Sequence, residues 1–164
     1  MITVAILTVS DSAAAGARED QSGPAIQESC EELGWRVVTS AIVPDEQDRI
    51  SEQLRHWADG TDVGVIFTTG GTGVAARDVT PEATRAVLDR EIPGISELMR
   101  IKGMQQTPFS ALSRAVAGTR NACLIVNLPG SPKGARFSLE VIRALIPHIL
   151  ALLQGNTEHE PAAS

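Results

Sequence analysis

The sequence predicts an α/β fold, in which a mostly parallel sheet carries helices on both faces, formed by a single domain over residues 1–154. Apolar runs of strand length alternate along the chain with amphipathic segments of helix length, which is the order of βαβ units. Some of these runs, such as residues 4–9, are apolar at nearly every position, as in parallel strands covered on both faces. A length of 164 residues suits one core, and no internal repeat or linker divides the chain.

The first half of the chain is predicted to form two strand–helix units and a third strand. In order, these are a strand at residues 4–9, a loop at 10–23, a helix opened by Pro24 and stopped by Gly34, a strand at 35–43, a helix at 46–59 and a strand at 63–69. Ile26, Cys30 and Leu33 recur at helical spacing and form the apolar stripe of the first helix. Proline suits a first helical turn and glycine a helix end, which sets the bounds of that helix.

The second half is predicted to be richer in helix. In order, we expect helices at residues 80–88, 95–104 and 108–115, a strand at 122–128, a long helix at 136–153 and a flexible polar tail at 155–164. The pairs Thr80-Pro81 and Thr107-Pro108 each supply a capping hydroxyl and a proline for the first turn. Pro147 lies inside the long helix and is expected to kink it.

The composition disfavours several classes of protein. Fourteen Lys and Arg against twenty Asp and Glu give a net charge of −6, which disfavours nucleic acid and anionic membranes because both bind through their phosphates. No apolar stretch reaches the length of a membrane span and no basic stretch precedes the first strand, so we expect a cytoplasmic protein. Cys30 and Cys123 are expected to be reduced, and three scattered histidines make no zinc site.

Small and polar residues follow four of the predicted strands. The strand ends carry Ser10 and Asp11, then Asp45, then a glycine-rich turn with Asp78 beyond it, and finally the loop Pro129, Gly130, Ser131 and Pro132 with Lys133. In an open α/β sheet, ligands bind outside the carboxyl ends of the strands. We therefore expect these residues to meet at one edge of the sheet and to form the ligand site there.

The glycine turn, formed by Gly70, Gly71, Thr72 and Gly73, is predicted to bind an anion. Glycine lets the backbone approach a ligand and turn successive N–H groups toward anionic oxygens. The turn is not a Walker A loop, because no Lys-Ser/Thr pair follows at the required spacing. Residues 71–76 formally match the G-x-G-x-x-A dinucleotide fingerprint, but the next helix starts late, which disfavours a nicotinamide or flavin oxidoreductase.

Asp45 and Asp78 each stand just before a predicted helix, and each alone is explained by interaction with the helix dipole. Together, at neighbouring strand ends, they indicate Mg²⁺, because two carboxylates can hold this ion while phosphates complete its coordination.

Two further observations concern the ligand itself. Lys133, beside the last strand end, is either a phosphate ligand or a solvated surface lysine. With two Trp, three Phe and no Tyr in the chain, a ligand with a large ring system is expected to be held chiefly by backbone and polar groups.

Six segments resemble the molybdopterin adenylyltransferases, the bacterial enzymes of molybdenum cofactor biosynthesis and the equivalent G domains of the plant enzyme and of gephyrin. The segments are residues 8–12 (TVSDS), 43–46 (VPDE), 69–73 (TGGTG), 77–83 (RDVTPEA), 112–114 (LSR) and 128–133 (LPGSPK). The resemblance covers nearly the whole chain, from Ile2 to about Leu153. It implies a molybdopterin-binding α/β domain, usually trimeric, that uses Mg-ATP to adenylylate the terminal phosphate of molybdopterin and releases pyrophosphate.

The same resemblance implies roles for individual residues. Asp78 would be the essential metal-coordinating aspartate, and Asp45 the second functional aspartate. The glycine turn and Ser113 would line the site of the molybdopterin phosphate. The nucleotide and pterin pockets would be bordered by Ser10, Asp11, Pro129, Gly130, Ser131 and Pro132. At Ser131 some relatives carry Asn or Gln.

Two questions of function stay open at this point. One is whether the chain works alone or passes its product to a molybdenum-insertion protein. A relative that binds pterin or nucleotide without catalysis is the nearer alternative, and the presence of both aspartates favours the enzyme.

Overall fold

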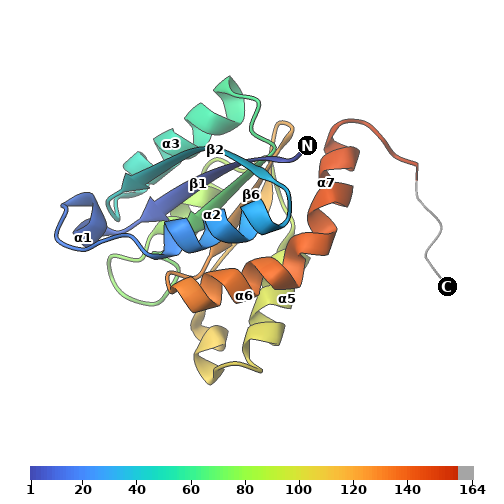
Figure 1. Ribbon diagram of the computed structural model, residues 1–164. Helices are drawn as coiled ribbons and strands as arrows, with labels where there is room; N and C mark the ends of the chain where they lie inside the picture. The colour runs from blue at the N-terminus through green and yellow to red at the C-terminus, as the bar shows by residue number, and fades with distance from the viewer. Residues whose placement is uncertain (159–164) are drawn as a thin grey trace.

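The computed structural model describes residues 1–158, which form a six-stranded sheet with helices on both faces (Figure 1). The strands are β1 (Thr3–Val9), β2 (Arg36–Val43), β3 (Val65–Thr69), β4 (Arg90–Glu91), β5 (Ala117–Arg120) and β6 (Cys123–Leu128). The α-helices are α1 (Asp11–Ala14), α2 (Ser22–Glu32), α3 (Gln47–Gly60), α4 (Thr80–Arg85), α5 (Pro93–Gly103), α6 (Pro132–Ile142) and α7 (Ile146–Leu153). Two 3₁₀ turns, η1 (Pro108–Leu112) and η2 (Arg143–Leu145), complete the chain. The predicted fold class is confirmed.

Four parallel strands form the centre of the sheet, whose order is β2-β1-β3-β6-β5-β4. β2, β1, β3 and β6 are parallel, whereas β5 and β4 join them in antiparallel pairs. The chain leaves β1 toward β2 on one side and returns to β3 on the other side of β1. The loops that follow β1 and β3 therefore leave in opposite directions. The carboxyl ends of these two strands form the crevice in which such sheets bind ligands.

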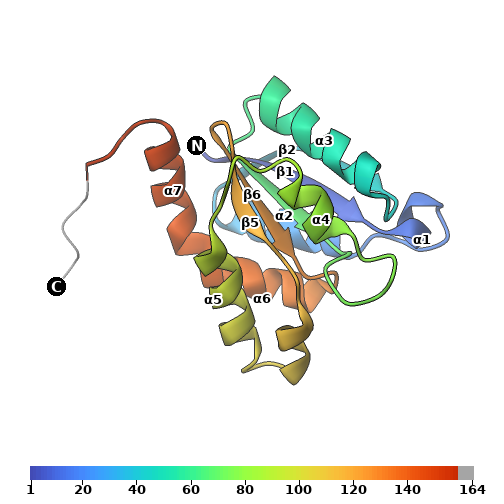
Figure 2. The same ribbon diagram turned by 180° about the vertical axis from the view of Figure 1, so that it is seen from behind.

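The two faces of the sheet pack into separate hydrophobic layers. On one face Val4 and Ile6 of β1 pack with residues of α2, α5, α6 and α7, and on the other Ala5 and Leu7 pack with residues of α3 and α4. Figure 1 shows α2 and α6 across the near face, and Figure 2 shows α3 and α4 across the opposite one. Because both faces are covered, the central strands are continuous apolar runs.

Several element boundaries differ from those expected. α1 lies within the predicted loop, β4 and β5 were not predicted, and the helix expected at 108–115 is the shorter η1. The long helix begins earlier, at Pro132, and η2 divides it into α6 and α7 just before Pro147. No helix within residues 1–158 is long and apolar enough to cross a membrane. Of the predicted tail, residues 159–164 lie outside the described part of the chain.

A buried amide joins the carboxyl ends of two strands to α4. The side chain of Asn127, on β6, is fully buried. Its Nδ2 donates to Thr68 Oγ1 on β3 and to Thr84 Oγ1 on α4, both at 2.9 Å. Its Oδ1 accepts from the N–H of Val116 at 3.1 Å. One side chain thus joins β6, β3, α4 and the residue before β5 at the ligand edge.

We expect Asn127→Ala to lower the free energy of unfolding by about 2–4 kcal/mol, because three hydrogen bonds are lost and a buried N–H is left without its acceptor. Urea unfolding measures the change. Asn156→Ala, at an exposed position near the end of the described chain, is the control and should change stability by less than about 0.5 kcal/mol. A loss below about 1 kcal/mol in Asn127→Ala would contradict the structural role of this amide.

Candidate active site

The glycine turn follows β3 and packs against the carboxyl end of β1. Gly70 and Gly71 have φ values of +97° and +68°, in the left-handed region that favours glycine. A Cβ on Gly70 would overlap the carbonyl of Val9, and one on Gly71 would overlap the Thr80 hydroxyl. Thr80 holds the turn from α4: its Oγ1 donates to the Gly70 carbonyl at 2.9 Å, and its N–H to the Gly71 carbonyl at 3.1 Å. Backbone conformation and close packing both require glycine here.

Two carboxylates lie against this turn. Asp45 Oδ1 is 3.1 Å from the place that a Cβ on Gly71 would take. Asp78 Oδ2 is 2.9 Å from the corresponding place on Gly73. Both carboxylates therefore occupy the space that glycine leaves free, one at each end of the segment from Gly71 to Gly73.

Neither aspartate caps the helix that it precedes. The N-cap residues are Glu46 for α3 and Val79 for α4, and neither makes a side-chain capping hydrogen bond. Thr80, expected as the cap of α4, is instead the first residue inside that helix. Asp78 Oδ2 accepts from the N–H of Ala75, three residues earlier, at 3.0 Å. Capping of the following helix explains neither carboxylate.

Asp11 and Arg77 complete the charged group. Arg77 donates through Nε and Nη2 to both oxygens of Asp11, at 2.9 and 2.8 Å. The N–H of Asp11 donates to Asp45 Oδ2 at 2.9 Å, and the N–H of Asp45 donates to Asp11 Oδ1 at 3.0 Å. The hydrogen bond from Arg77 lowers the pKa of Asp11, whereas partial burial and the charges of Asp11 and Asp78 raise the pKa of Asp45. One guanidinium faces three carboxylates, which leaves an excess of negative charge.

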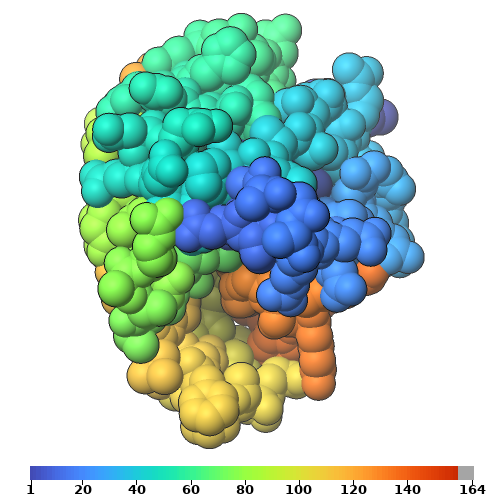
Figure 3. Space-filling view, turned by 90° about the vertical axis from the view of Figure 1, so that its left-hand side faces the viewer, coloured from blue at the N-terminus to red at the C-terminus, as the bar shows by residue number. Residues whose placement is uncertain are grey.

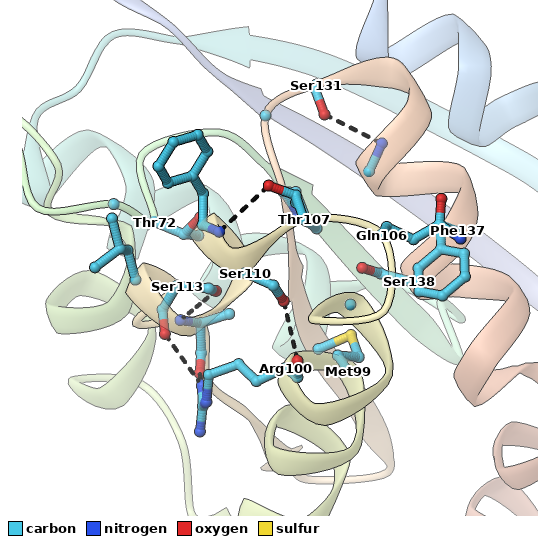
Figure 4. A pocket seen from close by; sticks show the side chains of 18 of the residues that line it. Thr72, Met99, Arg100, Gln106, Thr107, Ser110, Ser113, Ser131, Phe137 and Ser138 are labelled. Carbon is cyan, nitrogen blue, oxygen red and sulfur yellow. Dashed lines mark hydrogen bonds between the residues drawn. The ribbon is translucent and has the colours of Figure 1, made fainter.

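A cavity of about 430 Å³, here called the larger cavity, opens beside the glycine turn. In Figure 3 the surface is hollowed between the yellow segment around η1 and the orange start of α6. The predicted site residues that line it are Thr72, Gly73, Ser113, Pro129, Gly130, Ser131 and Lys133. Ser131 is the N-cap of α6, and its Oγ accepts from the N–H of Gly134 at 3.1 Å (Figure 4).

The wall of the larger cavity formed by α5, η1 and α6 was not predicted. Its side chains include Ser96, Met99, Arg100, Gln106, Phe109, Phe137 and Ser138, several of which Figure 4 labels. Two of the three phenylalanines line the cavity, beside the backbone and polar groups that were expected to be the chief contacts of a large ring. The sequence signal for this wall was Gly103: a Cβ there would overlap Ser110, so α5 and η1 pack in close contact.

A second cavity of about 190 Å³, the smaller cavity, lies next to the first. Its predicted lining residues are Ser10, Gly70, Gly130 and Pro132. The lining also carries hydroxyl, guanidinium, carboxylate and amide groups, from Thr8, Arg18, Glu19, Asp20, Gln21 and Ser22. Gly130 lines both cavities, and the glycine turn extends from the smaller cavity at Gly70 to the larger at Thr72 and Gly73. Gly71, Asp11, Asp45 and Asp78 line neither and form the charged group beside the turn.

Comparison with known proteins identifies close relatives. The family model described as a probable molybdopterin binding domain matches residues 5–148. The molybdopterin adenylyltransferase of Helicobacter pylori strain J99 is 44% identical over 157 residues, which cover 94% of this chain and 89% of that protein. The crystal structure of the molybdopterin biosynthesis enzyme MoaB from Thermus thermophilus superposes with a TM-score of 0.89 at 52% identity, covering 94% of this chain and 98% of that one. The chain also matches the molybdenum cofactor synthesis protein cinnamon of Drosophila melanogaster at 43% identity, but spans only 26% of its length.

We expect Asp45→Asn to raise the melting temperature at pH 7, because the charged carboxylate is partly buried and faces Asp11 and Asp78. The folded-state pKa of Asp45 lies above its ordinary value of 3.8, so its charge opposes folding at neutral pH. Below 3.8 the carboxyl is protonated in both the folded and the unfolded chain. The gain in stability should therefore shrink as the pH falls toward that value.

Thermal unfolding between pH 7 and pH 4 measures this difference. Asp48→Asn is the control, because Asp48 is an exposed acid in the first turn of α3, where its charge complements the helix dipole. That variant should show no gain at pH 7. A melting temperature for Asp45→Asn at or below the wild-type value at pH 7 would contradict the assigned electrostatics.

Proposed function

The chain belongs to the molybdopterin-binding domain family of molybdenum cofactor biosynthesis, and we propose that it adenylylates molybdopterin over its glycine turn, with Mg-ATP as the second substrate. The observation that carries this proposal is the turn itself, which extends from one cavity to the other with Asp45 and Asp78 against it. Two phosphorylated substrates bound in the two cavities would meet where both carboxylates lie.

The larger cavity suits molybdopterin. The rings of Phe109 and Phe137 offer apolar surface to a pterin, and polar groups such as Ser96 and Gln106 offer hydrogen-bond partners to its edge. The terminal phosphate would lie at Thr72 and the following glycine, near the N-terminus of α6, where the helix dipole favours anions. The ring and the phosphate are thereby held at opposite ends of one cavity.

The smaller cavity suits part of the nucleotide. Ser10, Gln21 and Ser22 supply hydrogen-bonding groups, and Arg18 supplies a positive charge next to the carboxylates of Glu19 and Asp20. Because this cavity meets the larger one at Gly130, a nucleotide bound there would place its phosphates beside the glycine turn. The assignment of ATP to this cavity is part of the proposal.

The reaction requires little of the protein beyond alignment of the two substrates. A terminal phosphate oxygen of molybdopterin attacks the α-phosphorus of ATP, the bond from the α-phosphorus to the bridging oxygen breaks, and pyrophosphate leaves. The attacking phosphate is already ionised at neutral pH, so no side chain has to remove a proton. Alignment of two anions in a fixed geometry is the main contribution of the site.

The donor set fits Mg²⁺, which takes oxygen ligands and is usually bound by one or two carboxylates together with substrate phosphates. Asp45 and Asp78 are the residues that would hold it, beside the excess negative charge that raises the pKa of Asp45. Within residues 1–158 no group of three or more His, Cys, Asp and Glu side chains is arranged to hold a metal ion alone. When bound, the ion would neutralise charge on the reacting phosphates.

The alternatives are less consistent with the site. A nicotinamide enzyme requires a helix that opens directly from the glycine fingerprint, whereas α4 begins only at Thr80. A relative that binds pterin without catalysis has no need to keep two like charges, Asp45 and Asp78, against the phosphate-binding turn. A catalytic function explains why both carboxylates lie against the turn.

The proposal includes the setting of the enzyme. Cys30 and Cys123 are unpaired and buried, and burial raises the pKa of each thiol to about 12, which suits a reducing compartment such as the cytoplasm. A molybdenum-insertion protein is the proposed recipient of the product. We further propose a homo-oligomer, a trimer as the family resemblance implies, because Ile101 of α5 and Met104, the residue that follows this helix, are 58% and 47% exposed.

Light scattering at micromolar concentration tests the assembly, and we expect a mass three times that of the 17.3 kDa chain. Ile101→Glu should shift the mass toward the monomer, because a charge at a buried apolar contact costs binding energy. Val38→Glu, at an exposed apolar residue of β2, is the control and should leave the mass unchanged. A monomeric wild-type protein would overturn the proposed assembly.

We expect Asp78→Asn to fold normally and to bind molybdopterin, but to lose adenylyl transfer by about a hundredfold or more. The amide keeps an oxygen to accept from Ala75, but it lacks the charge that would hold a cation against the transferring group. Pyrophosphate release from molybdopterin and Mg-ATP, melting temperature and pterin affinity are measured on the same preparation.

Asp89→Asn is the matched control for Asp78→Asn. The Asp89 carboxylate also accepts from a backbone N–H, that of Asn121 at 2.7 Å, but it lies outside both cavities and the charged group. Its variant should retain full transfer. Normal pyrophosphate release from Asp78→Asn would refute the metal role of that aspartate.

A further inference from the structure

The guanidinium of Arg114 contacts both ends of the segment that leads from the glycine turn to Asp78. Its Nε donates to the carbonyl of Gly73 at 2.7 Å, and its Nη2 donates to the carbonyl of Asp78 at 2.7 Å. Its Nη1 forms an ion pair with Glu82 of α4. The N–H of Arg114 also donates to the carbonyl of Thr72 at 2.8 Å. Four donors of one residue thus hold the turn, the aspartate and the following helix.

The segment that Arg114 spans has few other restraints. Residues 74–77 are exposed and lie outside any helix or strand. Apart from the Arg77 side chain, the hydrogen bonds found there are local: the N–H of Ala75 donates to Asp78 Oδ2, and the N–H of Asp78 donates to the Ala75 carbonyl, both at 3.0 Å. Local bonds in an exposed loop open readily unless the ends of the loop are held, and they do not fix its distance from the larger cavity.

Arg114 is itself anchored to the wall of the larger cavity. Arg100 of α5 donates through Nη1 to the carbonyls of Ser113 and Ala115, the two neighbours of Arg114, at 3.4 and 3.1 Å (Figure 4). Ser113 and Arg100 both line that cavity. A continuous set of hydrogen bonds therefore runs from the predicted pterin cavity, through Arg114, to the backbone of Asp78.

Only a guanidinium suits this position. Its donors diverge in one plane and reach two carbonyls and a carboxylate at once, whereas the ammonium of lysine is a single point charge. Glu82 Oε2 is buried without a hydrogen-bond partner among the described residues, so Arg114 is the cation that offsets this carboxylate. A neutral residue in place of Arg114 alone would leave Glu82 without its partner charge.

We propose that Arg114 is a positioning residue for adenylyl transfer, which fixes the backbone of Asp78 relative to Thr72 and Gly73 of the phosphate-binding turn. The inference rests on the proposed function, because it assumes that Asp78 acts on the reaction at this turn. Arg114 touches neither substrate: it acts through the segment that it holds. A displacement of a reacting group by about 1 Å can cost a factor of about a hundred in rate, so a small movement of Asp78 is enough to matter.

Arg114→Lys tests the proposal, with Arg120→Lys as the matched control. Arg120 uses its donors in the same way: Nε and Nη2 donate to Asp59, both at 2.8 Å, and Nη1 donates to the carbonyl of Val87 at 2.9 Å. None of these partners belongs to either cavity or to the charged group. Both variants lose a comparable set of hydrogen bonds, but only one loses it beside Asp78.

We expect Arg114→Lys to lower kcat by about tenfold or more while KM for molybdopterin changes by less than about threefold. Amide hydrogen exchange at Ala75 and Asp78 should accelerate by about tenfold or more in the same variant. Arg120→Lys should keep the wild-type kcat and the wild-type exchange at these two amides. An unchanged kcat in Arg114→Lys, or an equal loss in both variants, would overturn the proposal.

A double variant, Arg114→Gln with Glu82→Gln, covers the case in which Arg114→Lys does not fold. It removes both charges together, so no carboxylate is left without its partner. Low kcat with fast exchange at residues 75 and 78 supports the proposal, and wild-type values of both overturn it. If the wild-type protein shows no transfer, the proposed function fails, whereas the exchange rates still decide whether Arg114 holds the segment.

Discussion

The carboxyl edge of the sheet depends on the buried amide of Asn127. A buried amide is stable only when its donors and acceptor are paired, and here the partners come from β3, α4 and the residue before β5. α4 must therefore lie across the ends of β3 and β6 for the interior to be satisfied. Thr80, in the first turn of that helix, then bonds the glycine turn, and the turn is fixed by a requirement of the core.

The placement of α4 also explains why the two aspartates are free for chemistry. A helix that opens without a side-chain cap leaves the Asp78 carboxylate to bond back to Ala75, against Gly73. Asp45 is in a similar position before α3, where its partner is the N–H of Asp11. The neighbouring Asp11 forms an ion pair with Arg77, whereas Asp45 has no such partner among the described residues and its pKa is raised. Burial of an unneutralised charge is typical of a functional site, where stability is lost in exchange for function.

The sequence predicted the elements that periodicity and special residues specify. The parallel strands are long apolar runs, and their ends carry the glycines, aspartates and hydroxyls that the structure brings to one edge. β5 and β4 were not predicted, because Ala117-Gly118-Thr119-Arg120 has little apolar character and Arg90-Glu91 has none. The wall of the larger cavity was not predicted, for another reason. The pattern of α5 predicts a helix, but the face that Ser96, Met99 and Arg100 present to a ligand depends on how α5 packs against η1 and α6, and the one local sign of that packing is Gly103.

Under the proposed function, an acidic protein with a net charge of −6 binds two polyanions, and the groups of the site both favour and oppose that binding. Backbone N–H groups of a glycine turn and the N-terminus of α6 favour phosphate by fixed dipoles, and Lys133 and Arg100 of the larger cavity and Arg18 of the smaller add positive charge. The carboxylates of Asp45 and Asp78 work against these dipoles, so phosphates alone are repelled at the point where they would react. Under the proposed mechanism a divalent cation reverses that repulsion. The negative charge then acts as a filter: a nucleotide that carries its cation is accepted beside the turn, and one that lacks it is not.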